Sequence, residues 1–517
     1  MSIKEGKMKK IVTVFLVICM VIALSACGGG GGGDSAGKDT LSVGVTNDYG
    51  TLDFTHILGM EDFVNIARMY AEPLYNYIDD EGTIKWLLAT EWEQPTPTKW
   101  IFHLREGVTF SNGNPFTAED VLFTLDKANN TSGQYPYFPN LDWENCKVID
   151  DYTVEFNFTS YDLSYQYNLC QMGILDAESF DAESYSTTPI GTGPYVVTDY
   201  VVNSHTNMTA NEDYWGEPAI IKNLEFKVLN EDSQRINALE INSVDMAVIP
   251  TQEFGYVKDL DDYDLHVNPA YQAHAIWYNV TPEGLFNSVD ARMAINHAID
   301  RESIIKLVFD DHATLCDWPH AMSAKDIEER TLKLNDSYAK GYDPELAKQY
   351  VEKAGLAGKE IRLMTNGTPV QVAMAEIMQQ NFIDVGLNVV INNYDEASYV
   401  MLAQDTSVFD LYLRTAQAPS NTAAQNYNGW MNVPYMTDGL FLGDKGESFK
   451  EMNARVMSIA DEKERLDVVY DMTKIFIDAP AWYAICEPDK GTAVNSGLEN
   501  VYFTPYGQVY WNEWSWK

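Results

Sequence analysis

The sequence is poor in basic residues for its length. Lysine and arginine together number 35 in 517 residues, against 76 aspartates and glutamates, so the formal net charge is −41. A surface this acidic repels nucleic-acid phosphates and anionic lipid headgroups, and no basic stripe along the chain offsets the repulsion. We therefore expect no nucleic-acid partner.

Cysteine and histidine are also scarce. The six cysteines include no Cys-x-x-Cys pair, and the eight histidines form no cluster with the spacing of metal ligands. The sequence therefore predicts neither a metal site nor a cofactor. Cys146, Cys170, Cys316 and Cys486 lie far apart, which favours buried free thiols and leaves one or two disulfides between distant segments as the alternative.

Long apolar runs are missing except near the start of the chain. The run at residues 11–24 follows Lys9-Lys10 and precedes the small residues Ser25 and Ala26. It is shorter than the roughly 20 residues that a transmembrane helix needs. A basic start, a short apolar stretch and small residues are typical of a secretory signal peptide, here residues 1–26.

The residues around Cys27 predict a lipid anchor. Leu24-Ser25-Ala26-Cys27 resembles the bacterial lipobox, in which the cysteine is acylated and becomes the first residue of the mature chain. The glycine-rich segment 27–38 that follows is typical of a flexible tether. We expect a protein held at the extracellular face of the cell membrane, or on the periplasmic side in a cell with an outer membrane. An ordinary cleaved signal with an incidental cysteine is the alternative.

The rest of the chain alternates between strand and helix patterns. Period-two patterns predict strands at 41–45, 100–105, 153–158, 361–364, 389–391 and 410–413, and the helix patterns cover 67–74, 117–127, 289–308, 343–355 and 461–477. This alternation indicates α/β lobes with mixed sheets. A chain of 517 residues is too long for one ordinary core, so we expect two or more lobes.

Several local features within these elements can be predicted. The Thr117 hydroxyl is expected to accept hydrogen bonds from the free amides at the start of its helix. Gly113 is expected to form a turn. Gly191 and Gly193 are small enough for two segments of the chain to cross there, between lobes.

Six short motifs occur in a fixed order along the mature chain. They are Glu72-Pro73-Leu74-Tyr75, Phe102-His103-Leu104-Arg105-Glu106-Gly107-Val108, and the segments 110–121, 189–195, 211–216 and 292–301. The ordered set resembles the peptide- and nickel-type solute-binding proteins of ABC importers, family 5, and covers essentially the whole mature chain.

The resemblance implies a two-lobe α/β fold of the periplasmic-binding-protein type, in its large three-domain type II variant, with mixed β-sheets and a hinge. Lobe I would comprise 39–72, 189–270 and 483–517, with an insert domain at 73–188 and lobe II at 271–482. A monomer would hold a small molecule or peptide between its lobes and deliver it to permease and ATPase subunits.

The segment 414–422 departs from the pattern of both branches. Peptide-binding members hold the ammonium group of a peptide with an aspartate here, but Ser420 and Asn421 occupy the position, so ordinary peptides with a free amino end lose a charge-assisted partner. Nickel-type members use arginines and a tryptophan. The loops 134–138 and 169–173 contain no arginine, and Ala416 replaces the tryptophan.

The candidate ligand residues are aromatic, neutral polar and cationic, namely Tyr49, His56, Tyr135, Tyr137, Arg414, Gln417, Ser420, Asn421 and Trp430. Arg414 is the predicted partner of a ligand carboxylate, and a salt bridge that fixes its loop is the alternative role. A modified or amino-blocked peptide, a sugar-like solute and a metal chelate all fit this set. We favour a peptide-like solute because peptide binders are frequent in the family.

Two other functions compete with solute import. A secreted hydrolase would need a nucleophile elbow or a His-Glu-x-x-His helix, and the sequence has neither. We therefore expect no enzymatic activity. A receptor that presents a nutrient or peptide to a sensor would have the same sequence features as an importer subunit.

Overall fold

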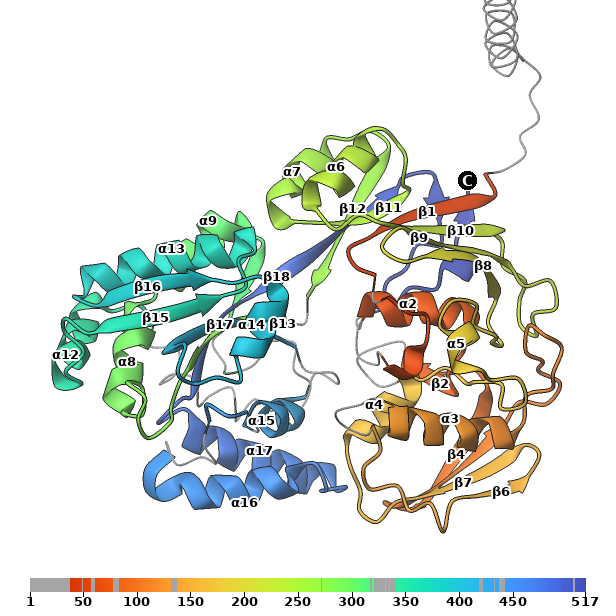
Figure 1. Cartoon of the computed structure of the whole chain (residues 1–517), viewed down its shortest axis with the longest axis horizontal. Helices are drawn as coiled ribbons and strands as arrows, with labels where there is room; N and C mark the ends of the chain where they lie inside the picture. Colours follow the sequence, from red (N-terminus) through yellow and green to blue (C-terminus); the bar gives the residue numbers. More distant parts are fainter. Residues whose placement is uncertain are drawn as a thin grey trace, which may run out of the picture. The chain divides into compact units, whose positions relative to one another are not determined.

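The computed structural model describes residues 38–48, 50–56, 61–77, 83–131, 137–270, 272–316, 319, 331, 334, 341–417, 422–431, 433–436, 442–504 and 507–517 (Figure 1). Residues from Asp39 onward form one unit. Within the described ranges, none of the helices combines the length and the apolar character that crossing a bilayer requires.

A large mixed sheet runs through this unit. Its strands follow the order β16 (Asn388–Asn393), β15 (Glu360–Thr365), β17 (Leu411–Gln417), β13 (Gln272–Tyr278), β18 (Trp482–Asn495), β11 (Met246–Ile249), β1 (Thr40–Val45), β10 (Asn223–Val228), β9 (His205–Ala210) and β8 (Tyr195–Val201), and β12 (Tyr263–Pro269) and β14 (Ala313–Leu315) also pair with β18. β1 and β10 are parallel, whereas β13 and β17 are antiparallel. The predicted α/β class with mixed sheets is confirmed.

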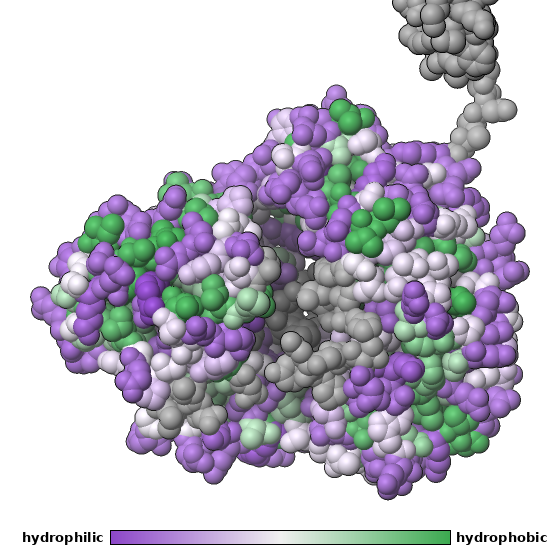
Figure 2. Space-filling model, viewed as in Figure 1, coloured by the Kyte–Doolittle hydropathy of each residue, from purple (hydrophilic) through white to green (hydrophobic). Residues whose placement is uncertain are grey.

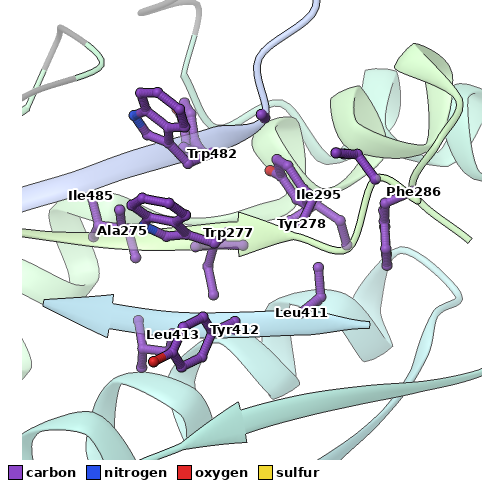
Figure 3. Close-up of a cluster of buried hydrophobic side chains, with 14 of the residues drawn as sticks. Ala275, Trp277, Tyr278, Phe286, Ile295, Leu411, Tyr412, Leu413, Trp482 and Ile485 are labelled. Atoms are coloured by element: carbon purple, nitrogen blue, oxygen red, sulfur yellow. The ribbon is translucent and has the colours of Figure 1, made fainter. Parts of the chain in front are cut away.

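The long strand β18 joins the two largest hydrophobic cores of the described chain, and its Ala493 belongs to a third, smaller core around Phe254. Its first residues pair with β13, so that Trp482 stacks on Trp277 with ring centres 5.1 Å apart (Figure 3). Its last residues pair with β11 and β12, and Val494 belongs to a different core with Phe226. We call these the Trp277 core and the Phe226 core. Leu163 packs against both of them, so the two cores touch at this residue.

Helices cover the sheet around the Trp277 core (Figure 1). They are α8 (Val289–Ala298), α9 (Arg301–Phe309), α12 (Pro344–Lys353), α13 (Pro369–Asp384), α14 (Glu396–Leu402), α15 (Ala423–Met431), α16 (Gly446–Val456) and α17 (Glu462–Phe476). Pro344 begins α12, and Gly355, with a φ of 64°, follows its end, as predicted.

A smaller sheet extends the Phe226 core. Its order is β4 (Ala89–Thr96), β5 (Lys99–Leu104), β7 (Thr153–Asn157) and β6 (Lys147–Asp150), and α3 (Ala118–Thr131) packs on it. Val154, Phe156 and Phe158 are all buried, which confirms that they share one face.

The remaining elements of the described chain are short. They are η1 (Phe54–His56), α2 (Glu61–Tyr70), β2 (Tyr75–Tyr77), β3 (Ile84–Trp86), α4 (Ser164–Gln171), α5 (Ala182–Tyr185), α6 (Asp232–Glu240), η2 (Thr251–Glu253), α7 (Phe254–Lys258), β19 (Leu498–Glu499), η4 (Trp511–Glu513) and β20 (Ser515–Trp516).

Two predicted helices have the wrong bounds. The helix expected at 67–74 is α2 and ends at Tyr70, because the residue before Pro73 is restricted to extended conformations. The helix expected at 289–308 is divided into α8 and α9, since the Asp300 side chain accepts from the Ser303 amide and starts a new helix.

The cap of α3 works in the opposite direction from the prediction. The Thr117 amide and hydroxyl both donate to Asp120 Oδ2, at 2.7 and 3.2 Å. The carboxylate is the stronger acceptor, so it reaches back to the start of the helix and takes the role expected of the hydroxyl.

The glycines behave as their size predicts, although one crossing has a different partner. Gly113 has a φ of 92° and forms the expected turn. A Cβ on Gly191 would lie 2.0 Å from the Tyr70 carbonyl oxygen, and one on Gly193 would lie 2.5 Å from that of Met69. The close crossing is therefore real, but it is made against the last turn of α2 and not between lobes.

The four cysteines of the described chain are unpaired. Cys170, Cys316 and Cys486 are buried and Cys146 is half-buried. The interpretation as free thiols is confirmed.

Candidate ligand-binding site

A cavity of about 960 Å³ opens between segments from the two sides of β18 (Figure 2). Asn47 and Asn230, which line one wall, lie next to β1, which belongs to the Phe226 core, and next to α6, which belongs to the core around Phe254. Gln272, Asn366 and Thr415, on the other wall, lie on or next to β13, β15 and β17. The volume is in the range of small-molecule sites, about 300–1,000 Å³.

His274 lies on the wall of this cavity. Its Nδ1 is 3.0 Å from the Thr415 hydroxyl oxygen, and its ring packs 5.5 Å from that of Phe309. Burial lowers the pKa of His274 to about 4. The imidazole is therefore neutral at physiological pH and presents a neutral polar surface to the cavity.

Arg414 lies on the opposite face of β17 from Thr415 and is not among the residues that line the cavity of about 960 Å³. Neighbouring residues of a strand point to opposite faces, and Arg414 is opposite Ala275 in the register with β13. Its guanidinium carbon is 4.9 Å from the centre of the Trp277 ring, and its Nη1 donates to the Tyr435 hydroxyl at 3.4 Å. Two aromatic side chains thus hold the guanidinium in place.

The guanidinium of Arg414 has spare hydrogen-bonding capacity. An arginine carries five N–H donors, and among the described residues this half-buried side chain has one ring contact, with Trp277, and one hydrogen bond, to Tyr435. In the part of the chain that the structure describes, no carboxylate pairs with it. The salt bridge offered as its alternative role is therefore not formed with any described residue.

The structure describes some of the other predicted ligand residues and not the rest. Tyr137 is half-buried at the edge of the Phe226 core, where its carbonyl accepts from Asn168 Nδ2 at 2.9 Å, and no contact joins it to Arg414 within the described residues. The backbones of His56, Gln417 and Trp430 lie in η1, β17 and α15. The predictions for Cys27, Tyr49, Tyr135, Ser420 and Asn421 fall outside the described residues.

The sequence did not point to the residues that position Arg414 or to the neutral pair on the cavity wall. Trp277 and Tyr435 hold the arginine, and His274 and Thr415 form the pair. The signal for His274 and Trp277 was an apolar run at 273–278 that a single histidine interrupts, with the imidazole and the indole on opposite faces of an extended segment. Across the described ranges, no group of three or more histidine, cysteine, aspartate or glutamate side chains is arranged to hold a metal ion.

Comparisons with known proteins agree with this architecture. The sequence profile of "Bacterial extracellular solute-binding proteins, family 5 Middle" matches residues 83–436. The nickel-binding periplasmic protein of Escherichia coli (strain K12) is 26% identical over 516 residues, which cover 94% of this chain and 96% of the relative. The oligopeptide-binding protein OppA of Bacillus subtilis (strain 168) is 25% identical over 561 residues, covering 97% and 98%.

A solved structure shares the fold. NikA from Brucella suis, in complex with Fe(III)-EDTA, superimposes with a TM-score of 0.80 at 21% identity, covering 92% of this chain and all of the other. The predicted two-lobe type II binding-protein fold is thereby confirmed.

Proposed function

The chain belongs to the bacterial extracellular solute-binding proteins of family 5, and from this premise we propose that it captures a peptide-like, carboxylate-bearing solute for an ABC importer. Its relatives are binding proteins of transport systems and not enzymes. The solute would lie between two lobes of a monomer, which would present it to the permease and ATPase subunits.

Arg414 is the observation that carries the proposal. A half-buried guanidinium that is held by Trp277 and Tyr435, without a carboxylate partner among the described residues, is prepared to pair with an anion. Arginine and carboxylate pair through two parallel hydrogen bonds, which gives both affinity and orientation. The carboxyl end of a peptide supplies such a group.

Ser420 and Asn421 support a ligand whose amino end is blocked or modified. They replace the acidic group that would pair with a free ammonium, so only neutral hydrogen bonds are available at that end. Tyr49, Tyr135, Tyr137 and Trp430 are proposed to pack against the solute, and His56 and Gln417 to complete its contacts.

A metal chelate is the second candidate, because the names of two of the compared proteins refer to metal ligands. The Escherichia coli relative is named for nickel, and the Brucella suis protein was solved with Fe(III)-EDTA. EDTA carries carboxylates, and Arg414 would pair with such a chelator as it would with a peptide.

The arrangement of the cores supports lobes that move about β18. We assign lobe I to 39–72, 189–270 and 483–517, the insert domain to 73–188, and lobe II to 271–482. β18 and the link between β12 and β13 are the connections that cross from one core to the other. Leu163 packs against both cores and its amide donates to the Met457 carbonyl at 3.0 Å, so rotation about these connections would have to break this contact while each core stays intact and the lobes close on the ligand.

The test compares an N-acetylated tripeptide with its C-terminal amide. Native mass spectrometry of freshly purified protein first weighs what it carries, and calorimetry then measures both peptides on protein stripped of ligand. We expect the acid to bind and the amide to bind more weakly, and Arg414→Ala to lose roughly 10- to 100-fold in affinity for the acid.

Arg455→Ala is the matched control, since it removes an exposed arginine that pairs with Glu464 on the surface. It should bind as the wild type does. Equal affinity for acid and amide, or an Arg414→Ala protein that binds as tightly as the wild type, would reject the assignment of Arg414.

A further inference from the structure

A second cavity, of about 750 Å³, lies beside the end of α2 and shares no lining residue with the first. Its walls come from the end of α2, from β3, from the segment after β8 and β9 at 214–220, and from η4. All of these segments belong to or border the Phe226 core, so the cavity lies apart from Arg414.

Arg68 is a buried cation in the wall of this second cavity. Its side chain is only 5% exposed. Nη1 donates weakly to Asn65 Oδ1 at 3.4 Å, Nη2 lies 3.3 Å from the carboxamide of Gln508, and Nε has no partner. Among the residues that the structure places, no carboxylate pairs with Arg68.

Other buried arginines of the protein are accommodated differently. Arg235 donates to the carbonyls of Leu229 and Val248, both at 2.7 Å, and Arg292 donates to that of Phe286 at 2.7 Å. Arg235 also forms an ion pair with Asp232, and Nε of the buried Arg465 lacks a hydrogen-bond partner in the described chain, as Nε of Arg68 does. Arg68 differs in that its two Nη atoms make only long contacts with side-chain amides. A buried charge without compensation is costly, and its position beside a cavity points to a ligand that supplies the negative charge.

Two of the carboxylates that line the cavity are engaged with other groups. Glu72 accepts from the Tyr214 hydroxyl and from Trp215 Nε1, each at 2.6 Å, and from Thr192 Oγ1 at 3.2 Å. Glu513 forms an ion pair with Lys85 Nζ at 2.5 Å. Glu217 also lines the cavity, so three acidic residues stand beside the cations Arg68, Lys85 and Arg105, and none of the three acids forms an ion pair with Arg68 among the described residues.

Aromatic rings form part of the remaining surface, and a cation already packs over one face of two of them. Trp86, Trp215 and Tyr510 line the cavity, with Arg105 packed 4.4 Å over the Trp215 ring and Lys85 packed 3.7 Å over the Tyr510 ring. Flat apolar surfaces next to a cation fit a planar ring that carries an anionic group.

We propose that this cavity is an accessory binding site for a small aromatic carboxylate, which pairs with Arg68 and packs its ring against the aromatic wall. The site is separate from the solute cleft. Its ligand would bind whether or not the cleft is occupied.

The test uses 4-fluorobenzoate as the probe and follows it by fluorine NMR with the purified protein. We expect saturable binding in the millimolar range or tighter, and a loss of about tenfold or more in Arg68→Met, because the charge-assisted pair is removed. Arg68→Met should keep or raise the melting temperature, since it removes an uncompensated buried charge. A purely structural arginine would instead lower it.

A second variant tests the site without altering the core. Ile220 lines the cavity and is 55% exposed, so Ile220→Trp should obstruct it, whereas Ile241→Trp, at an exposed position away from the cavity, should have no effect.

Failure of the probe to bind, or binding that survives Arg68→Met and Ile220→Trp, would overturn the proposal. Binding that is lost only in Arg414→Ala would also overturn it, because the probe would then lie in the solute cleft. The N-acetylated tripeptide should bind Arg68→Met as it binds the wild type, so this test is separate from that of the proposed function.

Discussion

At the scale of single residues, Glu72 is a buried acid surrounded by neutral donors. Burial raises its pKa from the usual 4.5 to about 7, although the hydrogen bonds from Tyr214, Trp215 and Thr192 act to lower it. The folded protein therefore holds the proton of Glu72 more tightly than the unfolded chain does. The contribution of this tighter proton binding to the free energy of unfolding is fully present below pH 4.5 and is lost as the pH rises through about 7.

Glu72→Gln should remove this pH dependence. The difference between the two pKa values corresponds to roughly 3 kcal/mol, so the variant should be more stable than the wild type by about 1–3 kcal/mol at pH 8 and similar to it near pH 4. Urea unfolding at several pH values measures the effect. His274, whose pKa of about 4 makes stability fall as the pH drops below 6.5, contributes equally to both proteins and cancels in the comparison.

The control for this comparison is Glu513→Gln, which changes an acid whose side chain is 54% exposed. It should follow the wild-type pH profile closely. If the stability of Glu72→Gln also followed the wild-type pH profile, ionisation of Glu72 in the folded protein would not lower the free energy of unfolding.

At the scale of elements, Asp300 determines where one helix ends and the next begins. Its Oδ1 accepts from the Ser303 amide at 3.0 Å, and its Oδ2 accepts from the Ser303 hydroxyl at 2.6 Å. Its own amide donates to Asn381 Oδ1 of α13 at 3.1 Å. The new direction of α9 carries Phe309 to the wall of the cavity, where it packs on His274.

Asp300→Ala should destabilise the protein by about 1 kcal/mol, because α9 loses its N-terminal cap. Ser288→Ala is the matched control, since Ser288 precedes α8 without a capping hydrogen bond from its side chain. Chemical unfolding should show a lower midpoint for Asp300→Ala and an unchanged one for Ser288→Ala. Equal midpoints would mean that packing against α13, and not the cap, fixes the start of α9.

At the scale of the whole molecule, the closure that we propose would turn about β18, which joins the two largest cores. The Trp277 core and the Phe226 core share this strand, and the large cavity lies between the segments that they support. A receptor of this kind must also stay near its importer, which is the role proposed for a lipid on Cys27.

Cys27→Ser should leave the precursor unprocessed and without lipid. Labelling cells with a fatty acid measures this directly, and the wild type should incorporate the label. Cys19→Ser, which changes a cysteine within the apolar leader, should be labelled normally. Normal labelling of Cys27→Ser would exclude the proposed anchor.

The elements that the sequence predicted well are those that depend on interactions between residues close together in the chain. β7 buries Val154, Phe156 and Phe158 on one face because alternation is a property of the strand itself. α17 begins after Asp461, whose side chain accepts from the Glu464 amide. The helix boundaries that failed, at Asp300 and near Pro73, depend on single residues that interrupt an otherwise helical pattern.

The sequence by itself determined the class of fold, the family and the candidate arginine, because periodicity, motif order and charge can be read along the chain. Only the tertiary structure decided what surrounds those residues. Glu72, Thr192 and the pair Tyr214 and Trp215 belong to three motifs far apart in the sequence, and folding brings them into one hydrogen-bonded cluster. In the same way Arg414 acquires its two aromatic neighbours from β13 and from the segment after α15. Contacts between distant segments depend on how the sheet and its cores assemble, and no local pattern specifies them.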